Sequence, residues 1–213
     1  MIAIMAIVIG STMFNWEGIN ASGNFNKALS DISGILEQGR AYAVAQDTYV
    51  WVVLYENDPA NSPVRTVYVG AFASNDGTDQ YPLNGTGAVT LPSSTLTAIT
   101  RLYKYTGLHL DNTLPTTLPA TVPNPPPTPN LPATFPVFTM TAPSNAGTVT
   151  LSGASTVYWL VQFTPTGAAM NGSNPIDSIW LVLEPASGAA VLNTHSIACL
   201  KVNGVTGLNT IYR

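Results

Sequence analysis

The first sixteen residues carry no charge, and this feature constrains the fold most. Met1–Ile9 reads MIAIMAIVI, and the first charged residue is Glu17. A membrane-spanning helix needs about 20 apolar residues, so the stretch is slightly short for one. A secretory signal peptide is the alternative interpretation. It fits poorly, because no basic residue precedes the apolar run and no clear small-x-small cleavage site follows it.

A second helical pattern follows the apolar run. Apolar or small residues recur every three or four positions, which is one face of a helix: Phe25, Ala28, Leu29, Ile32, Leu36, Gly39 and Ala43. Two glycines between the two stretches, Gly18 and Gly23, weaken any helix there. The sequence therefore predicts one long helix with a loosened middle that ends near Gln46 to Thr48.

Beyond Asp47 the pattern changes to strands. Runs rich in β-branched and aromatic residues alternate with turn residues. The predicted strands are Thr48–Glu56, Arg65–Ala73, Ile99–Tyr105, Val137–Thr141, Thr148–Leu151, Val157–Phe163, Ser178–Glu184, Ile197–Asn203 and Leu208–Tyr212. We expect the α+β class, with a long N-terminal α-helix packed on an antiparallel β-sheet domain.

A segment rich in proline and threonine, Pro115–Pro143, interrupts the strand pattern. Proline cannot donate to a sheet ladder and favours an extended conformation. A linker between two domains is one interpretation. A long surface loop inside one domain is preferred, because neither flank looks like a complete fold. Such segments suit O-glycosylation, and Asn20, Asn84 and Asn171 begin N-x-S/T triplets, which are candidate N-glycosylation sites.

Charge and cysteine usage exclude some classes. Charged residues make up 8% of the chain, against about 25% in ordinary soluble proteins. Seven Lys and Arg oppose eleven Asp and Glu, for a net charge of −4, which argues against a nucleic-acid partner. Cys199 is the single cysteine, so no disulfide forms within the chain.

Catalytic and metal-binding patterns are absent from the sequence. His109 and His195 have no partner at metal-ligand spacing and are expected to be structural. Cys199 lies in an alternating strand pattern and is expected to be buried and inert. Asp76–Asp79 resembles only a fragment of a calcium loop. We expect no enzyme activity, no cofactor and no metal.

The order of these segments resembles type IV pilins and the pseudopilins of type II secretion. The run Ile2–Ile9 is similar to the middle of the class III prepilin signature. The segment Leu36–Asp47, leading into a strand, resembles the H-type minor pseudopilin pattern. The segment Leu200–Arg213 is similar to the strand-TG-strand ending of pilin-like proteins. The first two motifs cover roughly the first 56 residues, and the remainder resembles the family in pattern more than in letters.

The resemblance implies two parts with different roles. Residues 1–24 would be the filament-core helix with its loosened segment, and residues 25–213 the globular domain that includes the loop 115–143. The residues expected in the filament core are Met1, Ile2, Ile4, Met5, Ile7, Val8, Ile9, Met13 and Phe14. Family members carry Glu at the fifth mature position, where this chain has Met5. The alignment places Met1 near the ninth mature residue, so we expect about eight residues and a leader upstream. The other possibility is a filament that assembles without the contact that this Glu makes.

The implied function is that of a major pilin-like subunit of an extracellular type IV pilus-like filament. Its partners would be other copies of itself, the inner membrane before assembly, the pilus or secretion assembly machinery, and glycans. Two alternatives remain. One is a minor pseudopilin of a type II secretion system, and the other is a secreted β-rich binding domain with a signal peptide.

Overall fold

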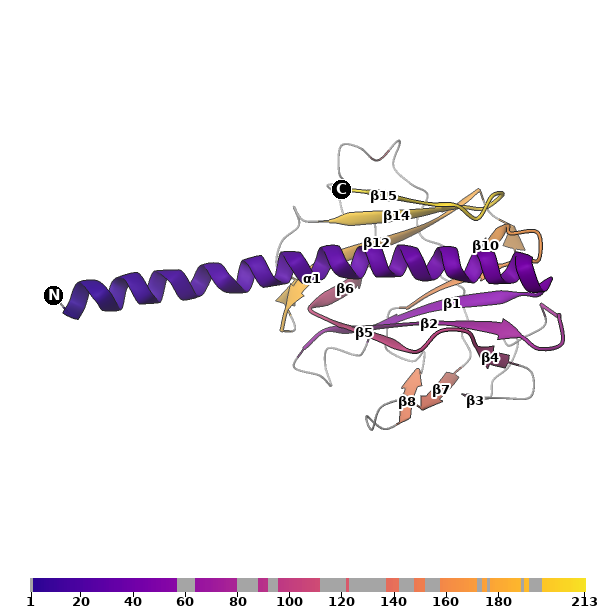
Figure 1. Cartoon of the computed structure of the whole chain (residues 1–213), viewed down its shortest axis with the longest axis horizontal. Coiled ribbons are helices and arrows are strands. Elements are labelled where there is room, and N and C mark those ends of the chain that lie inside the picture. Colours follow the sequence, from indigo (N-terminus) through magenta and orange to yellow (C-terminus); the bar gives the residue numbers. More distant parts are fainter. Residues whose placement is uncertain are drawn as a thin grey trace.

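A computed structural model provides the structure of the chain (Figure 1). It describes residues 2–56, 64–79, 88–91, 96–111, 122, 137–141, 148–151, 158–171, 174–175, 177–188, 190–191 and 197–213; side chains are not described for 2–22, 88–91, 137–141, 148–151, 158, 171 and 174–175. Met1, Asn84, His195 and all of the segment 115–143 except 122 and 137–141 lie outside these residues. The elements are α1 (Ile2–Gln46), β1 (Val50–Glu56), β2 (Thr66–Ser74), β3 (Ala88–Leu91), β4 (Leu96–Ala98), β5 (Tyr103–Thr106), β6 (Leu108–Asp111), β7 (Val137–Thr141), β8 (Thr148–Leu151), β9 (Tyr158–Phe163), β10 (Ala169–Asn171), β11 (Asn174–Pro175), β12 (Ser178–Ser187), β13 (Ala190–Val191), β14 (Ala198–Asn203) and β15 (Asn209–Tyr212).

The strands form three sheets in the described part of the chain. The largest has the order β11-β10-β9-β1-β2-β4, with β5 also paired to β2. The second has the order β13-β12-β14-β15, with β6 paired to β12, and the third has the order β3-β7-β8. All pairs are antiparallel except β3 with β7, which is parallel.

The expected fold class is wrong. The protein is mostly β-sheet, and the part of α1 that packs on the sheets is short, residues 23–46. All seven residues of β1 are buried, so both faces of its sheet are covered. A helix on a single sheet would leave the far face of that sheet in water. The additional sheets and the burial of both faces make this a mainly β protein.

The main core lies where α1 meets the two larger sheets. One face of β1 supplies Val50, Val52 and Leu54, and β12 of the second sheet supplies Leu181 and Leu183. All five side chains are buried in one hydrophobic cluster that also contains the apolar residues of α1. The helix therefore covers the line along which the two sheets come together, as Figure 1 shows.

The chain crosses between the two sheets at Gly107. This residue joins β5, in the first sheet, to β6, in the second. Its φ of 74° is a left-handed conformation, which glycine adopts without a steric cost. Its N–H donates to the carbonyl of Arg65, and its carbonyl accepts from the N–H of Ala186, each at 2.9 Å. Both sheets are thus hydrogen-bonded to the residue at the crossing.

Candidate functional site

The packed part of α1 is built into the domain through an apolar face. Leu29, Ile32 and Leu36 are fully buried, and Phe25 and Ala43 extend the same face at its two ends. These are the residues whose spacing predicted the buried side of the helix. Leucine and isoleucine at three- and four-residue intervals give a continuous apolar stripe, and this stripe fixes α1 on the sheets.

Gly39 allows the closest approach of α1 to the sheet. A Cβ placed on this glycine would lie 2.9 Å from Cγ2 of Val52 on β1 and 3.4 Å from Cγ1 of Val50. Non-bonded carbon atoms prefer about 3.5–4.0 Å. The absence of a side chain therefore sets how deeply the helix sits on β1. Gly34 differs, because a Cβ there would meet nothing within 4 Å.

Polar contacts hold the two flanks of α1. On one flank, Asn209 of β15 accepts from the Ser33 hydroxyl at 2.7 Å and donates Nδ2–H to Oε1 of Glu37 at 3.1 Å. On the other flank, the Tyr105 hydroxyl of β5 donates to Oδ2 of Asp31 at 3.2 Å. Burial raises the pKa of Tyr105, and the negative charge of Asp31 adds to the effect. The helix is therefore anchored to an edge strand of each of the two larger sheets.

Residues 2–22 of α1 extend away from the sheets, as Figure 1 shows at the N-terminal end of the helix. The predicted filament-core residues from Ile2 to Phe14 are on this part of α1, and Gly18 lies farther along it. Gly23, at the start of the packed part, is exposed and a Cβ there would meet nothing within 4 Å. Among the residues that the structure describes, no helix is long and apolar enough to cross a membrane. The filament-core and loosening roles remain predictions.

A buried ionic cluster joins the two larger sheets beside Gly107. Glu56, the last residue of β1, is 2% exposed. Its Oε1 accepts from Nη1 of Arg65 at 2.6 Å, and its Oε2 lies 2.8 Å from Nδ1 of His109 on β6. Its Oε2 also accepts the backbone N–H of Leu110 at 2.8 Å. One carboxylate therefore receives donors from β6, in the second sheet, and from the residue before β2, in the first.

The tautomer of His109 decides whether its Nδ1 donates or accepts a hydrogen bond in this cluster. Its Nδ1 lies 2.7 Å from Nη1 of Arg65 as well as close to Glu56. A ring with its proton on Nδ1 donates to the carboxylate, whereas a ring with its proton on Nε2 accepts from the guanidinium. Either form satisfies the buried charge of Glu56 through Arg65. This histidine thus has a structural partner, Glu56, that is 53 positions away in the sequence.

A second buried carboxylate faces the same cluster. Glu184 of β12 is directly opposite His109 in the sheet register and is 5% exposed. Burial raises the pKa of Glu184, and the nearby charge of Asp111 raises it further, while His109 and Arg65 act in the opposite direction.

Burial also raises the pKa of the Cys199 thiol to about 11. This thiol therefore stays protonated at neutral pH, which agrees with the expectation that it is inert.

The other candidates stay separate from these groups. Asp76 accepts hydrogen bonds from the hydroxyl of Ser74 and from the N–H and hydroxyl of Thr78, which lower its pKa to about 2. All three bonds go to Oδ1 of Asp76 and come from residues of its own turn. Asn20 lies in α1 and Asn171 ends β10. In the described ranges, no group of three metal-binding side chains is close enough together to hold a metal ion.

Comparisons with known proteins leave the family open. No family model matches the chain, and no curated protein or solved structure matches it either.

Proposed function

We propose that this protein is the repeating subunit of an extracellular filament of the type IV pilus kind, assembled through the apolar N-terminal segment of α1. The observation that carries the proposal is the division of this helix. Residues 25–43 bury a continuous apolar stripe in the domain, while residues 2–22 extend away from it (Figure 1). The extended part has no charge before Glu17.

An apolar helix that leaves its own domain needs another apolar environment. Exposure to water costs roughly 25 cal/mol for each Å² of apolar surface. Helices of neighbouring copies in a filament core supply such an environment. Contacts between different surfaces of identical subunits do not close on themselves, and they generate open helical fibres. The anchoring of α1 by Ser33, Asp31 and Glu37 would transmit the position of the core helix to the domain outside it.

Microscopy of cells that produce the full chain with its assembly machinery tests this proposal. Sheared material should contain long fibres composed mainly of this protein. Ile7→Asp should abolish them, because a charge at the centre of an apolar helical segment costs about 2.5–3.5 kcal/mol on membrane-insertion scales. Normal fibres from this variant would refute the filament-core role of the segment. Trace amounts confined to fibre tips would instead support the minor pseudopilin alternative.

A further inference from the structure

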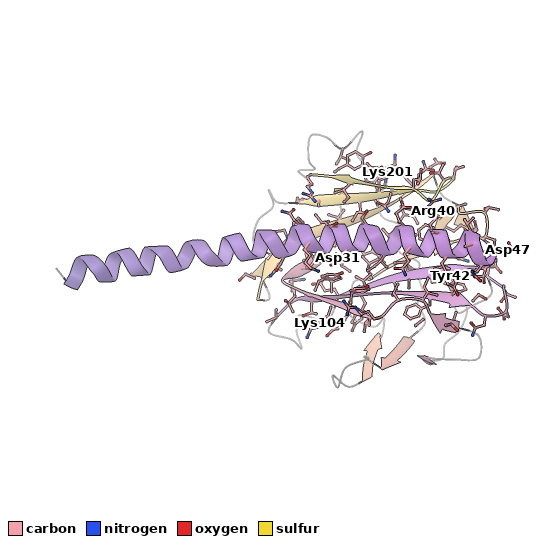
Figure 2. The ribbon with its side chains drawn as sticks, viewed as in Figure 1. Asp31, Arg40, Tyr42, Asp47, Lys104 and Lys201 are labelled. Carbon is pink, nitrogen blue, oxygen red and sulfur yellow. The ribbon has the colours of Figure 1, made fainter. Side chains whose placement is uncertain are left out.

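The turn between β14 and β15 begins with an asparagine that is followed by a glycine. Asn203 ends β14, and Gly204 is the first residue of the turn. Figure 2 labels Lys201, which lies two residues earlier on the same strand. An Asn–Gly pair is chemically labile, because glycine has no side chain to shield its backbone nitrogen from the preceding side chain. The same pair occurs in the sequence at Asn84 and Asn171.

Deamidation of this pair forms a new bond within the chain. The nitrogen of Gly204 loses its proton and bonds to Cγ of Asn203, and the side-chain nitrogen leaves as ammonia. Water then opens the resulting succinimide ring at either of its two carbonyl groups. The products are aspartate and isoaspartate, and in isoaspartate the backbone runs through the side chain and is longer by a methylene group. The reaction therefore needs a free N–H on Gly204 and an asparagine side chain that can turn toward it.

The folded structure holds both backbone groups of Gly204. Its N–H donates to the carbonyl of Asp177 at 2.9 Å, and its carbonyl accepts the N–H of Ala169 at 2.8 Å. Gly204 is also buried. Its amide proton is therefore bound and shielded from water, and a base can remove this proton only after the hydrogen bond to Asp177 has opened.

The side chain of Asn203 is held as well. Its Oδ1 accepts the N–H of Val205 at 3.0 Å, the N–H of Thr206 at 2.9 Å and the hydroxyl of Thr206 at 3.1 Å. Such bonds from a side chain to backbone groups just ahead of it are those of an Asx-turn. The backbone N–H of Asn203 donates to the carbonyl of Leu208 at 2.9 Å. With Oδ1 on these donors, Cγ is not free to rotate onto the nitrogen of Gly204.

The same turn is packed against α1. A Cβ on Gly207 would lie 2.7 Å from Cδ of Arg40, which Figure 2 labels on the helix. Directly after the turn, Asn209 makes the hydrogen bonds to Ser33 and Glu37 that attach α1 to β15. The closed turn thus belongs to the part of the domain that holds the helix, and its covalent integrity affects that attachment.

We propose that Asn203 is a latent deamidation site, which the closed β14–β15 hairpin protects and which reacts once the hairpin opens. The longer backbone of an isoaspartate at this position would shift the acceptor away from the N–H groups of Val205 and Thr206. A hairpin that has reacted in this way could not close again as before, and the attachment of α1 through Asn209 would weaken with it. The proposal does not depend on filament assembly, because it concerns the chemistry of a single copy.

Mass spectrometry of the full chain measures this protection. The purified protein is kept at pH 8 in buffer and in guanidinium chloride, and the peptide that contains Asn203 is analysed at intervals for aspartate and isoaspartate. Asn84 and Asn171 provide two further Asn–Gly pairs as references for the rate in the denaturant. In the native protein the reaction at Asn203 should be at least about tenfold slower than in the denaturant, since it waits for local opening. Equal rates at Asn203 in the two conditions would overturn the proposal.

A variant of the turn tests whether opening controls the reaction. Thr206→Val removes the hydroxyl that donates to Oδ1 of Asn203 and keeps the size of the side chain. It should speed the native reaction at Asn203 about threefold or more and raise hydrogen exchange of the Gly204 amide in parallel, because both need the open hairpin. Thr210→Val, at an exposed position of β15, is the matched control and should change neither rate. An Asn203 rate that does not rise in Thr206→Val, or that rises while the Gly204 amide exchanges no faster, would contradict this control.

Discussion

The carboxylate of Glu56 accepts the backbone N–H of Leu110 at 2.8 Å, although the two residues belong to different sheets. The strand that contains Leu110, β6, pairs with β12 in the second sheet. Glu56 ends β1 in the first sheet and also binds Arg65 and His109. A single buried side chain therefore hydrogen-bonds across the junction, next to the glycine where the chain changes sheets.

Removal of this carboxylate should destabilise the protein strongly. Glu56→Ala removes the buried carboxylate from its ion pair with Arg65, and the loss of one member of a buried ion pair costs about 3–5 kcal/mol. Urea denaturation should show this loss in the free energy of unfolding. Glu56→Gln keeps the shape and one acceptor, so it should lose less and remain folded. In that variant, hydrogen exchange of the Leu110 amide should be faster than in the unaltered chain. A loss below 1 kcal/mol in Glu56→Ala would contradict the role given to Glu56.

Two glycines on α1 should respond oppositely to alanine. Gly34→Ala should raise stability by up to about 1 kcal/mol, because alanine has the higher helix propensity and nothing lies within 4 Å of the new methyl group. Gly39→Ala should lower stability, since its methyl group would lie 2.9 Å from Val52 and overpacking costs about 1–3 kcal/mol. Thermal unfolding of the two variants measures the difference. Equal shifts in the same direction would show that α1 is not seated on β1 as described.

The attachment of α1 to β15 should depend on Asn209. Asn209→Ala removes the bonds to the Ser33 hydroxyl and to the Glu37 carboxylate, each worth about 0.5–1.5 kcal/mol in net stability. We expect a loss of about 1–3 kcal/mol. Hydrogen exchange should rise in α1 around Ser33 more than in β1. Thr210→Ala, on the next residue of β15, is the control and should leave the exchange of α1 unchanged.

Several of these relationships could be read from the sequence, and others could not. The helix end at Gln46 matches the prediction, and β1, β2, β7, β8, β9, β12, β14 and β15 lie at or close to predicted runs. The short strands β4, β6 and β10, of three or four residues, lie outside the predicted runs. Only part of the strand predicted at Ile99–Tyr105 forms, as β5 begins at Tyr103.

No local sequence pattern predicts the contact between Glu56 and His109. It depends on Gly107 turning the chain from one sheet to the other, and no motif in the sequence relates residues 53 positions apart. The fold class was wrong for a similar reason. The strand pattern showed which segments are extended, but it did not show that they divide among three sheets.

Cys199 should resist modification in the folded protein. Burial is the first cause of the raised pKa, about 11, and the nearby charge of Glu184 is the second. The thiolate is the reactive species, and below pH 11 most of the thiol is protonated. A disulfide reagent at pH 8 should label little of the native chain and all of the chain in urea. Rapid labelling of the native protein would contradict the buried position of this residue.

Replacement of Glu184 should change how stability depends on pH. Burial, and then the charge of Asp111, raise the pKa of this carboxyl in the folded state. A raised pKa means that the folded protein favours the neutral acid, so this contribution to stability is complete below the unfolded pKa and is lost as the pH rises through the folded pKa. Glu184→Gln keeps a neutral side chain of the same shape. It should therefore be more stable than the unaltered chain at pH 7 and lose that advantage near pH 4. Denaturation at both values measures the effect, and an equal difference at both would show that Glu184 does not titrate with folding.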